Sequence, residues 1–255
     1  MQLFDTHAHL YLNDFCSDID DVIERAQNRG VESVVLPNID KNSIEPLISL
    51  CKRYPGMLYP AMGLHPSDVK DNYKEQLGLI KQELDQNQCV AVGEIGVDLY
   101  WDKGFISQQK EAFKEQLNWA TEKSLPVVLH VRDAFDDAFE VLEEFEKGEL
   151  SGVFHCFSGS KYHARRIIEM GFHLGIGGVL TFKGSKLCAT VKDVPLENIV
   201  LETDAPFLTP SPHRGKRNES AYVYDIAKKL SEERGVTIEE IAEQTTINAR
   251  KLFGL

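Results

Sequence analysis

The sequence contains no apolar run long enough to cross a lipid bilayer, and it shows no secretory leader. A membrane-spanning helix needs about 20 consecutive apolar residues, and no segment of these 255 residues approaches that length. The N-terminal residues Met1–Asp5 also lack a basic region followed by an apolar stretch, which a signal peptide requires. We therefore predict a cytoplasmic protein that makes no contact with membranes.

Disulfide and zinc-finger patterns are missing as well. The chain has five cysteines, an odd number, and they are widely spaced without a Cys-x-x-Cys pair. This spacing argues against a disulfide framework and against a structural zinc finger, so we expect reduced thiols in the core. The residues concerned are Cys16, Cys51, Cys89, Cys156 and Cys188.

No linker rich in proline, serine or glycine divides the chain, and we expect residues 1–255 to form a single domain. Charged residues make up 27% and hydrophobic residues 42% of the sequence, which is ordinary for a globular protein. At this length about 75% of the surface of the unfolded chain can be buried. A large core is therefore possible, and nothing in the sequence points to an obligate protein partner.

Positive charge is scarce. The formal net charge of −12 argues against a broad phosphate-binding surface such as that of a histone. It does not exclude a nucleic-acid substrate, because a local basic patch is sufficient for one. Arg214, Lys216 and Arg217 form such a cluster in a predicted loop, although a solvated loop without function is the alternative interpretation.

Short apolar runs alternate with longer amphipathic segments along the whole chain, which is typical of β–α units with parallel strands. Strands are expected at Leu3–His9, Val31–Pro37, Met57–His65, Cys89–Gly96, Pro126–Val131, Gly152–His155, His173–Gly177 and Ile199–Asp204. Helices are expected at Asp18–Arg29, Ser43–Arg53, Tyr73–Gln86, Ser107–Lys123, Ala134–Lys147, Tyr162–Met170, Lys186–Lys192, Glu219–Arg234 and Ile238–Phe253.

Eight strands with intervening helices in about 250 residues predict an α/β protein with a (β/α)8 barrel of the TIM type. An open doubly wound sheet is the main structural alternative. It usually has fewer strands and, when it binds nucleotides, a glycine-rich first turn that is missing here. At the start of the last helix, Thr237 followed three residues later by Glu240 resembles a capping box.

His7 and His9 stand at the end of the first predicted strand. Residues two apart in a strand face the same side, so both imidazoles are directed at one point where the chain leaves the core. This geometry suits a metal ion, but a His-x-His pair taken alone is equally compatible with surface decoration.

Further metal-binding side chains follow other predicted strands. Each has an ordinary structural interpretation when taken singly, as a core histidine, a strand-end salt bridge or a helix cap. Barrel enzymes, however, build their sites at the carboxyl ends of the strands, and the joint arrangement indicates a metal centre. The six candidate ligands are His7, His9, Glu94, His130, His155 and Asp204.

Six ligands are too many for one tetrahedral ion and suit two ions that share a carboxylate. We assign the first ion to His7, His9, Glu94 and Asp204, and the second ion to Glu94, His130 and His155. The imidazoles favour zinc or manganese over magnesium, which prefers oxygen ligands. Glu94 occupies the place where related enzymes need a modified lysine, and it requires no modification.

Eight motifs in order along the chain resemble those of the TatD-like metal-dependent hydrolases, or TatD DNases, of the amidohydrolase superfamily. They are Asp5-Thr6-His7-Ala8-His9-Leu10, Gly63-Leu64-His65-Pro66, Gly93-Glu94-Ile95-Gly96, Leu125-Pro126-Val127-Val128-Leu129-His130, His155-Cys156-Phe157-Ser158-Gly159, Thr181-Phe182-Lys183, Glu202-Thr203-Asp204-Ala205-Pro206 and Arg214-Gly215-Lys216-Arg217-Asn218-Glu219. The resemblance implies a metal-dependent hydrolase linked mainly to cleavage of DNA, often from 3′ ends, although some members are linked to other hydrolyses such as removal of D-amino acids from tRNA.

Two positions depart from the family pattern. Ser67 follows Gly-Leu-His-Pro where a second histidine is frequent, and Ser220 follows Asn218-Glu219 where proline is usual. Both lie beside the expected site, so they concern substrate contacts and leave the ligand assignment intact.

Three residues fit a phosphate-binding role. His65, Arg132 and Arg214 could donate to substrate oxygens or neutralise a phosphate; a bracing histidine and salt-bridged arginines are the alternatives. Tyr100 and Trp101 could stack on a base, or simply pack.

The sequence thus predicts a deoxyribonuclease that trims single-stranded DNA or 3′ ends with two divalent ions. Asp204 is expected to orient the water and accept its proton, Glu94 to bridge the ions, and His65 to assist at the reacting phosphate. The first alternative is hydrolysis of another ester or amide, such as D-aminoacyl-tRNA, on the same ligands. The second is a non-catalytic, metal-stabilised protein of a repair or cell-death assembly.

Overall fold

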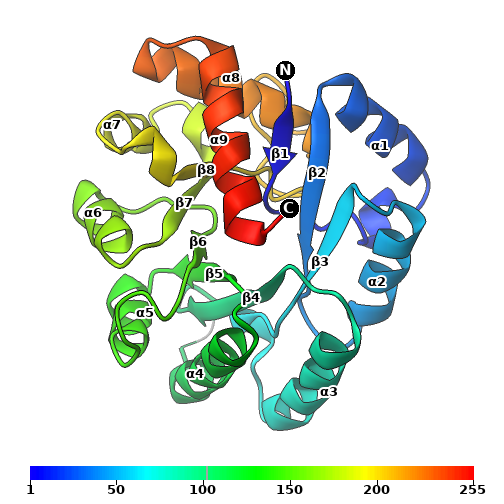
Figure 1. The fold of residues 1–255 in the computed structure, drawn as a ribbon, viewed down its shortest axis with the longest axis vertical. Coiled ribbons are helices and arrows are strands. Elements are labelled where there is room, and N and C mark those ends of the chain that lie inside the picture. The colour runs from blue at the N-terminus through cyan, green and yellow to red at the C-terminus, as the bar shows by residue number, and fades with distance from the viewer. Residues whose placement is uncertain (102) are drawn as a thin grey trace.

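Eight parallel strands, β1 to β8, stand side by side in their order along the chain, with the helices outside them (Figure 1). The structure is a computed structural model and describes residues 1–101 and 103–255. The strands in this part of the chain are β1 (Leu3–Asp5), β2 (Val31–Pro37), β3 (Leu58–Met62), β4 (Ala91–Asp98), β5 (Val127–Arg132), β6 (Gly152–Phe154), β7 (His173–Ile176) and β8 (Ile199–Leu201).

The first and last strands close the barrel. Beyond β1 the chain runs beside the segment that follows β8: the Thr6 amide donates to the Leu201 carbonyl at 3.0 Å, and the His9 amide donates to the Ala205 carbonyl at 2.7 Å. Ala8 and Ala205 form a parallel bridge. The predicted (β/α)8 barrel is therefore confirmed, although β1 ends four residues earlier than the sequence pattern suggested.

The helices follow the predicted alternation. They are α1 (Ile19–Asn28), α2 (Ile44–Arg53), α3 (Tyr73–Gln86), α4 (Ile106–Lys123), α5 (Phe135–Leu142), α6 (Lys161–Glu169), α7 (Leu187–Val191), α8 (Val223–Arg234) and α9 (Ile238–Phe253). Short 3-10 turns lie at η1 (Asn13–Phe15), η2 (Pro66–Asp68), η3 (Gly178–Thr181), η4 (Leu196–Asn198) and η5 (Ser220–Tyr222). None of the helices in the described residues is both long and apolar enough to span a membrane.

Two helix ends differ from the prediction by more than one residue. The segment expected to continue α5 to Lys147 instead leaves the helix after Leu142, because the amides of Glu144 and Phe145 donate to carbonyls three residues back and Phe145 packs against the core. At α8, Glu219 is extended and its carboxylate binds Arg25, so the helix begins only at Val223.

The interior of the barrel is apolar at the end where the strands begin. Helix α9 lies across this end (Figure 1), and its residues Ala249 and Phe253 join the cluster inside. The rings of Phe253 and Phe4 stack with their centroids 6.0 Å apart. The strands contribute Phe4, Val35, Ala61, Ala91, Val128, Val153 and Val200 to the same cluster. At the N-terminus of α9, Thr237 and Glu240 form the predicted capping box.

All five cysteines are free thiols, and only Cys51 is fully buried. Cys16 is exposed on the surface, so the expectation that all of the thiols lie in the core is wrong for this residue. Cys16 follows the 3-10 turn η1, in which Phe15 is the residue that turns inward.

Candidate metal centre

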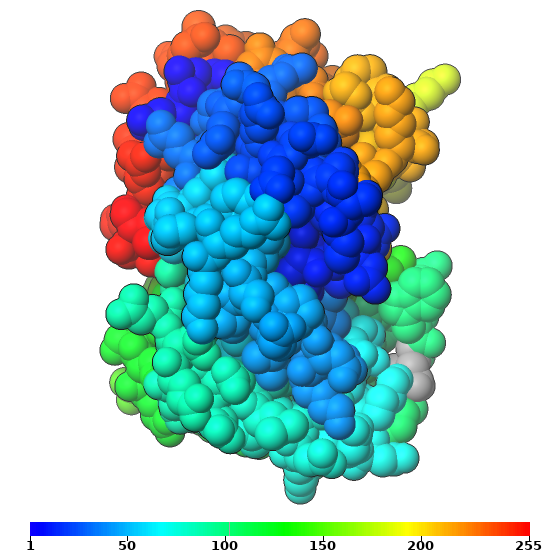
Figure 2. Space-filling view, turned by 90° about the vertical axis from the view of Figure 1, so that its right-hand side faces the viewer, coloured from blue at the N-terminus to red at the C-terminus, as the bar shows by residue number. Residues whose placement is uncertain are grey.

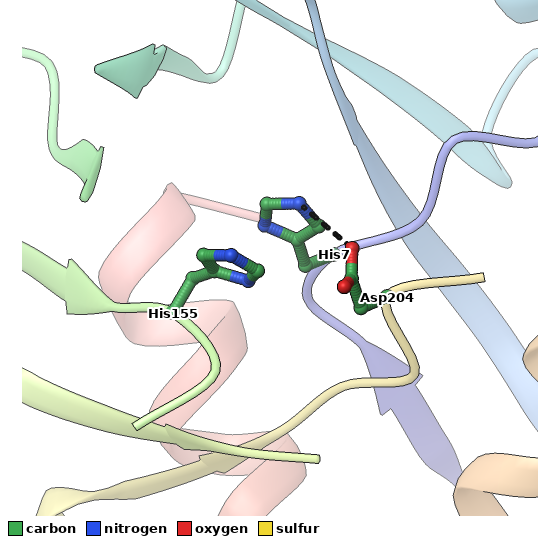
Figure 3. Close-up of side chains that lie close together, drawn as sticks. All are labelled: His7, His155 and Asp204. Carbon is green, nitrogen blue, oxygen red and sulfur yellow. Dashed lines mark ion pairs between the residues drawn. The ribbon is translucent and has the colours of Figure 1, made fainter. Parts of the chain in front are cut away.

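The structure brings the six predicted ligands together at the carboxyl ends of the strands. His7 and His9 follow β1, Glu94 lies in β4, and His130 lies in β5. His155 and Asp204 follow β6 and β8, and Figure 3 shows them directed toward His7 from different sides. The imidazole rings of His7 and His155 are nearly parallel, with their centroids 3.7 Å apart.

Local backbone features aim these side chains inward. Between β4 and β5 the register shifts at Glu94, since Gly93 pairs with Val128 and Ile95 already with Leu129. Such a bulge turns a side chain away from the regular alternation of a strand. Gly96 follows with φ of 140°, and a Cβ atom there would lie 2.1 Å from the carbonyl oxygen of His130, so only glycine fits.

A first group of donor atoms surrounds the Nε2 atom of His7. The Nε2 atom of His9 lies 3.1 Å away, Oε2 of Glu94 lies 3.2 Å away, and Oδ1 of Asp204 lies 3.7 Å away. His9 Nε2 is itself 3.5 Å from Glu94 and 3.6 Å from Asp204. These are the four residues predicted for the first ion.

The hydrogen bonds of this group leave more lone pairs than protons. The Tyr11 hydroxyl donates to the Pro37 carbonyl at 2.6 Å, so it accepts from Nδ1 of His9 at 2.9 Å, and in the neutral ring Nε2 of His9 is then an acceptor. Buried acceptors therefore face one another, and His7 Nε2 is the one ring nitrogen that could supply a proton. A divalent cation satisfies such a set, so the residues present fit a metal ion.

A second group surrounds the other carboxylate oxygen of Glu94. Its Oε1 atom lies 2.8 Å from Nδ1 of His130, 3.1 Å from Nε2 of His155 and 3.4 Å from Nε2 of His65. Because Nε2 of His130 binds the Asp98 carboxylate at 2.8 Å, the contact between His130 and Glu94 requires a positive charge. A second proton on the ring meets this requirement, and so does a cation in its place. The two oxygens of Glu94 thus serve different groups, as a shared carboxylate must.

The imidazoles control the charge of the central carboxylates. Burial would raise the pKa of Glu94, but His155, His7 and His65 hold this pKa well below its usual range. Burial likewise opposes ionisation of Asp204, whose pKa is nevertheless lowered by His9, His155 and His7. Both side chains are therefore carboxylates at neutral pH, which is the form that binds cations.

Three residues that orient the candidate ligands were missed in the sequence analysis. Asp98 binds His130, Tyr11 binds His9, and the buried carboxylate of Glu202 lies 3.2 Å from Nδ1 of His155. Glu202 also accepts from the Cys156 amide at 2.5 Å. The signal was available in part, because Asp98 and Glu202 stand an even number of residues from Glu94 and Asp204, and even spacing in a strand places side chains on one face.

The two groups lie at the bottom of a cavity of about 530 Å³. The side chain of Asp204 is 15% exposed, whereas that of Glu94 is 3% exposed. Asp204 is therefore the more accessible of these two candidate ligand carboxylates, although both line the cavity. The residues that line the cavity are His9, Ile39, His65, Ser67, Glu94, Trp101, His130, Val131, Arg132, His155, Cys156, Ser158, Val179, Asp204, Phe207 and Leu208.

Of the three predicted phosphate-binding residues, two line the cavity and one does not. His65 lies within the second group, and Arg132 lines the cavity with its guanidinium 3.6 Å from the Tyr100 ring centroid. Arg214 does not line this cavity; it donates to the Thr209 carbonyl at 2.9 Å and lies over the Phe182 ring.

Of the two residues that depart from the family pattern, one lines the cavity and the other does not. Ser67 lines the cavity, and its backbone amide donates to Nδ1 of His65 at 3.1 Å. Ser220 is buried in η5 and does not line it. Nearby, Arg217 of the basic cluster binds both oxygens of the Asp18 carboxylate, so its charge is largely offset.

Comparison with known proteins shows relatives along almost the whole chain. The family model described as TatD related DNase matches residues 4–254. An uncharacterized metal-dependent hydrolase, YabD of Bacillus subtilis (strain 168), is 42% identical over 252 residues, which cover 98% of each chain. The 3′-5′ ssDNA/RNA exonuclease TatD of Erwinia tasmaniensis is 31% identical over 259 residues, covering 99% of this chain and 100% of that protein.

A solved structure matches over almost the whole length. The crystal structure of YJJV, a TatD homolog from Escherichia coli k12, superposes with a TM-score of 0.93 at 31% identity, covering 99% of this chain and 98% of that one. The chain therefore belongs to the TatD related DNase family of metal-dependent hydrolases.

Proposed function

We propose that this hydrolase cleaves phosphodiester bonds of DNA and removes nucleotides from the 3′ end of a single strand. The observation that supports the proposal most strongly is the buried set of donor atoms at the bottom of a cavity with Arg132 at its side. The name of the Erwinia relative, an exonuclease that acts on single-stranded DNA and RNA, supports the same substrate class.

Two divalent ions, zinc, manganese or magnesium, would be held by the two groups. His7, His9, Glu94 and Asp204 would hold one of them. Glu94, His130 and His155 would hold the other. The donor atom of His65 clusters with those of Glu94 and His130, and that of His155 also clusters with those of His7 and Asp204. When bound, such ions activate water and offset the negative charge that develops on phosphate oxygens.

We assign to Asp204 the role of general base, which accepts a proton from the attacking water molecule. Its carboxylate is ionised and reaches the cavity, so it can orient a water molecule and accept its proton. Glu94 lies deeper and holds both groups together. His65 also lines the cavity, and we assign it a supporting role at the substrate phosphate.

Arg132 supplies positive charge to the substrate. Its guanidinium can donate to phosphate oxygens and offset part of the charge of the surrounding carboxylates. Arg214 is the weaker candidate for substrate binding, because its guanidinium is already engaged with Thr209 and Phe182.

Replacing Asp204 by asparagine tests the proposal. Asparagine is nearly isosteric and tolerates the left-handed φ of 58° at this position, so Asp204→Asn should keep the fold. It cannot accept the proton, and loss of a general base usually lowers the rate about 10²–10⁴-fold. We expect this loss in kcat rather than in DNA affinity, measured with an end-labelled single strand and a metal-reconstituted protein.

Asp193→Asn is the matched control, because Asp193 is exposed on the surface and pairs only with a lysine in the described structure. Two results would contradict the proposal. Near-normal turnover of Asp204→Asn would place the base elsewhere, with His65 the next residue to change. Intact DNA together with hydrolysis of D-aminoacyl-tRNA or of a lactone would favour the rival chemistry on the same ligands.

A further inference from the structure

Exposed aromatic side chains surround the opening of the cavity that contains the metal-binding groups. Trp101 is 71% exposed and Phe207 is 51% exposed, and both line this cavity. Tyr100 lines a neighbouring hollow of about 620 Å³ that shares Arg132 with the first. Single exposed apolar residues need no explanation, but two rings at one opening, with a third beside it, indicate a surface that receives a flat apolar group.

The two rings in the cavity come from different loops. Trp101 follows β4, and Phe207 lies in the segment between β8 and η5. Figure 2 shows the segment after β8, in gold, and the segment after β4, in green, projecting from the same side of the molecule with a hollow between them. A ligand in the cavity therefore meets aromatic surface from two parts of the chain.

Trp101 is tied to the metal-binding groups through one carboxylate. Oδ1 of Asp98 accepts from the amides of Tyr100 at 2.9 Å and Trp101 at 3.3 Å, while Oδ2 of the same residue binds His130. The residue that orients a metal ligand thus also fixes the start of the aromatic loop. This connection fixes the backbone from which the indole of Trp101 projects.

Phe207 is tied to the other group of ligands. Its amide donates to the Asp204 carbonyl at 2.8 Å, and its own carbonyl accepts from Asn218 at 2.5 Å. The Phe207 ring lies 6.1 Å from the ring of His9, centroid to centroid. The backbone at both aromatic residues is therefore fixed by hydrogen bonds to residues beside the reacting centre, which reduces the ordering of the loops that a bound ligand requires.

Arg132 adds a positive charge to this aromatic opening. Among the described lysine and arginine side chains, it is the one that lines the cavity. Its guanidinium lies 3.6 Å from the ring centroid of Tyr100 and 5.5 Å from that of Trp101. One cation beside two apolar rings matches a ligand that combines a flat ring system with a phosphate, and a nucleotide is such a ligand.

We propose that Trp101 and Phe207 form a subsite for an unpaired nucleobase, which lies against these rings while its phosphate reaches Arg132 and the ligands below. The inference rests on the proposed function and adds to it the part of the substrate that is recognised. It also gives a physical reason for preferring single strands, because both faces of a base within a duplex are covered by its neighbours.

Removing the base from the substrate tests the subsite. We would compare a single-stranded oligonucleotide with the same strand carrying abasic tetrahydrofuran units at its two 3′-terminal positions. Stacking on an aromatic ring contributes enough affinity that Trp101→Ala and Phe207→Ala should each lower kcat/KM about 10-fold on the normal strand. On the abasic strand the same variants should differ from the native protein less than about 2-fold, because no base is there to stack.

Tyr162→Ala is the matched control, since Tyr162 is 62% exposed on α6 and lines neither cavity. It should leave both rates unchanged, and Trp101→Phe should restore most of the rate lost in Trp101→Ala. Equal losses of the Trp101 and Phe207 variants on both strands would overturn the subsite, because they would mean that the rings only shape the loops. Absence of any loss would overturn it as well.

A binding experiment separates the subsite from the proposed function. Trp101 is exposed and the second tryptophan, Trp119, is buried in α4, so a ligand in the cavity should quench the fluorescence of Trp101 alone. Thymidine monophosphate should quench the native protein and not Trp101→Ala, and deoxyribose 5-phosphate should quench neither. If no oligonucleotide is cleaved but this pattern appears, the nuclease proposal fails and the subsite stands. Equal quenching by the sugar phosphate would overturn the subsite.

Discussion

At the end of the barrel that α9 covers, the interior is filled by apolar side chains, whereas at the end where the strands stop it is filled by histidines and carboxylates. Phe4 and Phe253 stack on each other at the covered end. At the open end, His7 and Glu94 are as deeply buried, but each contacts other polar groups. Burial at the first end stabilises the fold directly, while burial at the second costs desolvation that bound cations can offset.

Backbone conformation shows the same contrast. Among the described non-glycine residues, five have positive φ, and four of these follow the carboxyl ends of strands. The four are Asp133, Cys156, Asp204 and Leu208. Left-handed backbone is unfavourable for most residues and persists only where the surroundings enforce it. The comparison teaches that side chains at the covered end raise the free energy of unfolding of the barrel, whereas the polar burial and left-handed backbone at the open end lower it.

The largest effect is expected for Glu94→Gln. Removing one preorganised electrostatic group from an active site lowers kcat about 10²–10³-fold, and Glu94 serves both groups of ligands, so we expect at least the upper end of this range. Metal content should fall as well, as measured by elemental analysis beside a rate assay on DNA. Glu75→Gln, on an exposed side chain, is the control. Full activity and two ions per chain in Glu94→Gln would refute the bridging role.

Phe253→Ala at the covered end is expected to lower the stability of the protein while leaving its catalytic rate nearly unchanged. Truncating a buried phenylalanine costs about 3–5 kcal/mol of unfolding free energy, which urea denaturation would measure. Because this ring is far from the cavity along the barrel axis, kcat of the folded fraction should stay within about 2-fold of the native value. Leu255→Ala, on a more exposed residue, should have little effect on either quantity. A fall in kcat as large as the fall in stability would show that the two ends are coupled.

A smaller effect is expected for Asp98→Asn, which keeps a hydrogen-bond acceptor for His130 but removes the negative charge. Partners that orient metal ligands are commonly worth about 10–100-fold in metal affinity, and the conservative change should give about 10-fold. In the metal-free protein the pKa of His130 should fall, since burial lowers this pKa and Asp98 and Glu94 raise it. NMR titration of the ring would report the shift. Asp137→Asn, in the first turn of α5 where the side chain lies 3.6 Å from Lys110, should leave both quantities unchanged. An unchanged pKa in Asp98→Asn would contradict the orienting role.

The alternation of strands and helices and the positions of the donor residues were predictable from the sequence. Both follow from local rules: periodicity assigns an element to each segment, and the carboxyl ends of parallel strands meet at one end of a barrel. His7, Glu94 and Asp204 could be assigned to one site because each stands where a predicted strand ends. No contact between distant residues had to be known for this step.

The orienting contacts were not predictable in the same way. That Tyr11 fixes the proton of His9 depends on a hydrogen bond to Pro37, and no periodicity of the sequence indicates which carbonyl lies there. Similarly, Arg132 and Arg214 had equal claims from their residue types, and only the structure separates them, because Arg132 lines the cavity whereas Arg214 donates to the Thr209 carbonyl outside it. Side-chain direction in loops is set by tertiary contacts rather than by local sequence pattern.

The position of α9 has a consequence for folding of the chain during its synthesis on the ribosome. Phe253 packs on Phe4, and the Thr246 hydroxyl donates to the carbonyl of Gln2 at 3.2 Å, so the segment made first is covered by one made long afterwards. Contacts this distant along the chain form slowly, because a long loop must close before they form. During synthesis the valines inside the barrel therefore stay exposed to solvent until α9 has been made. Until then we expect the nascent chain to be most prone to aggregation and to chaperone binding.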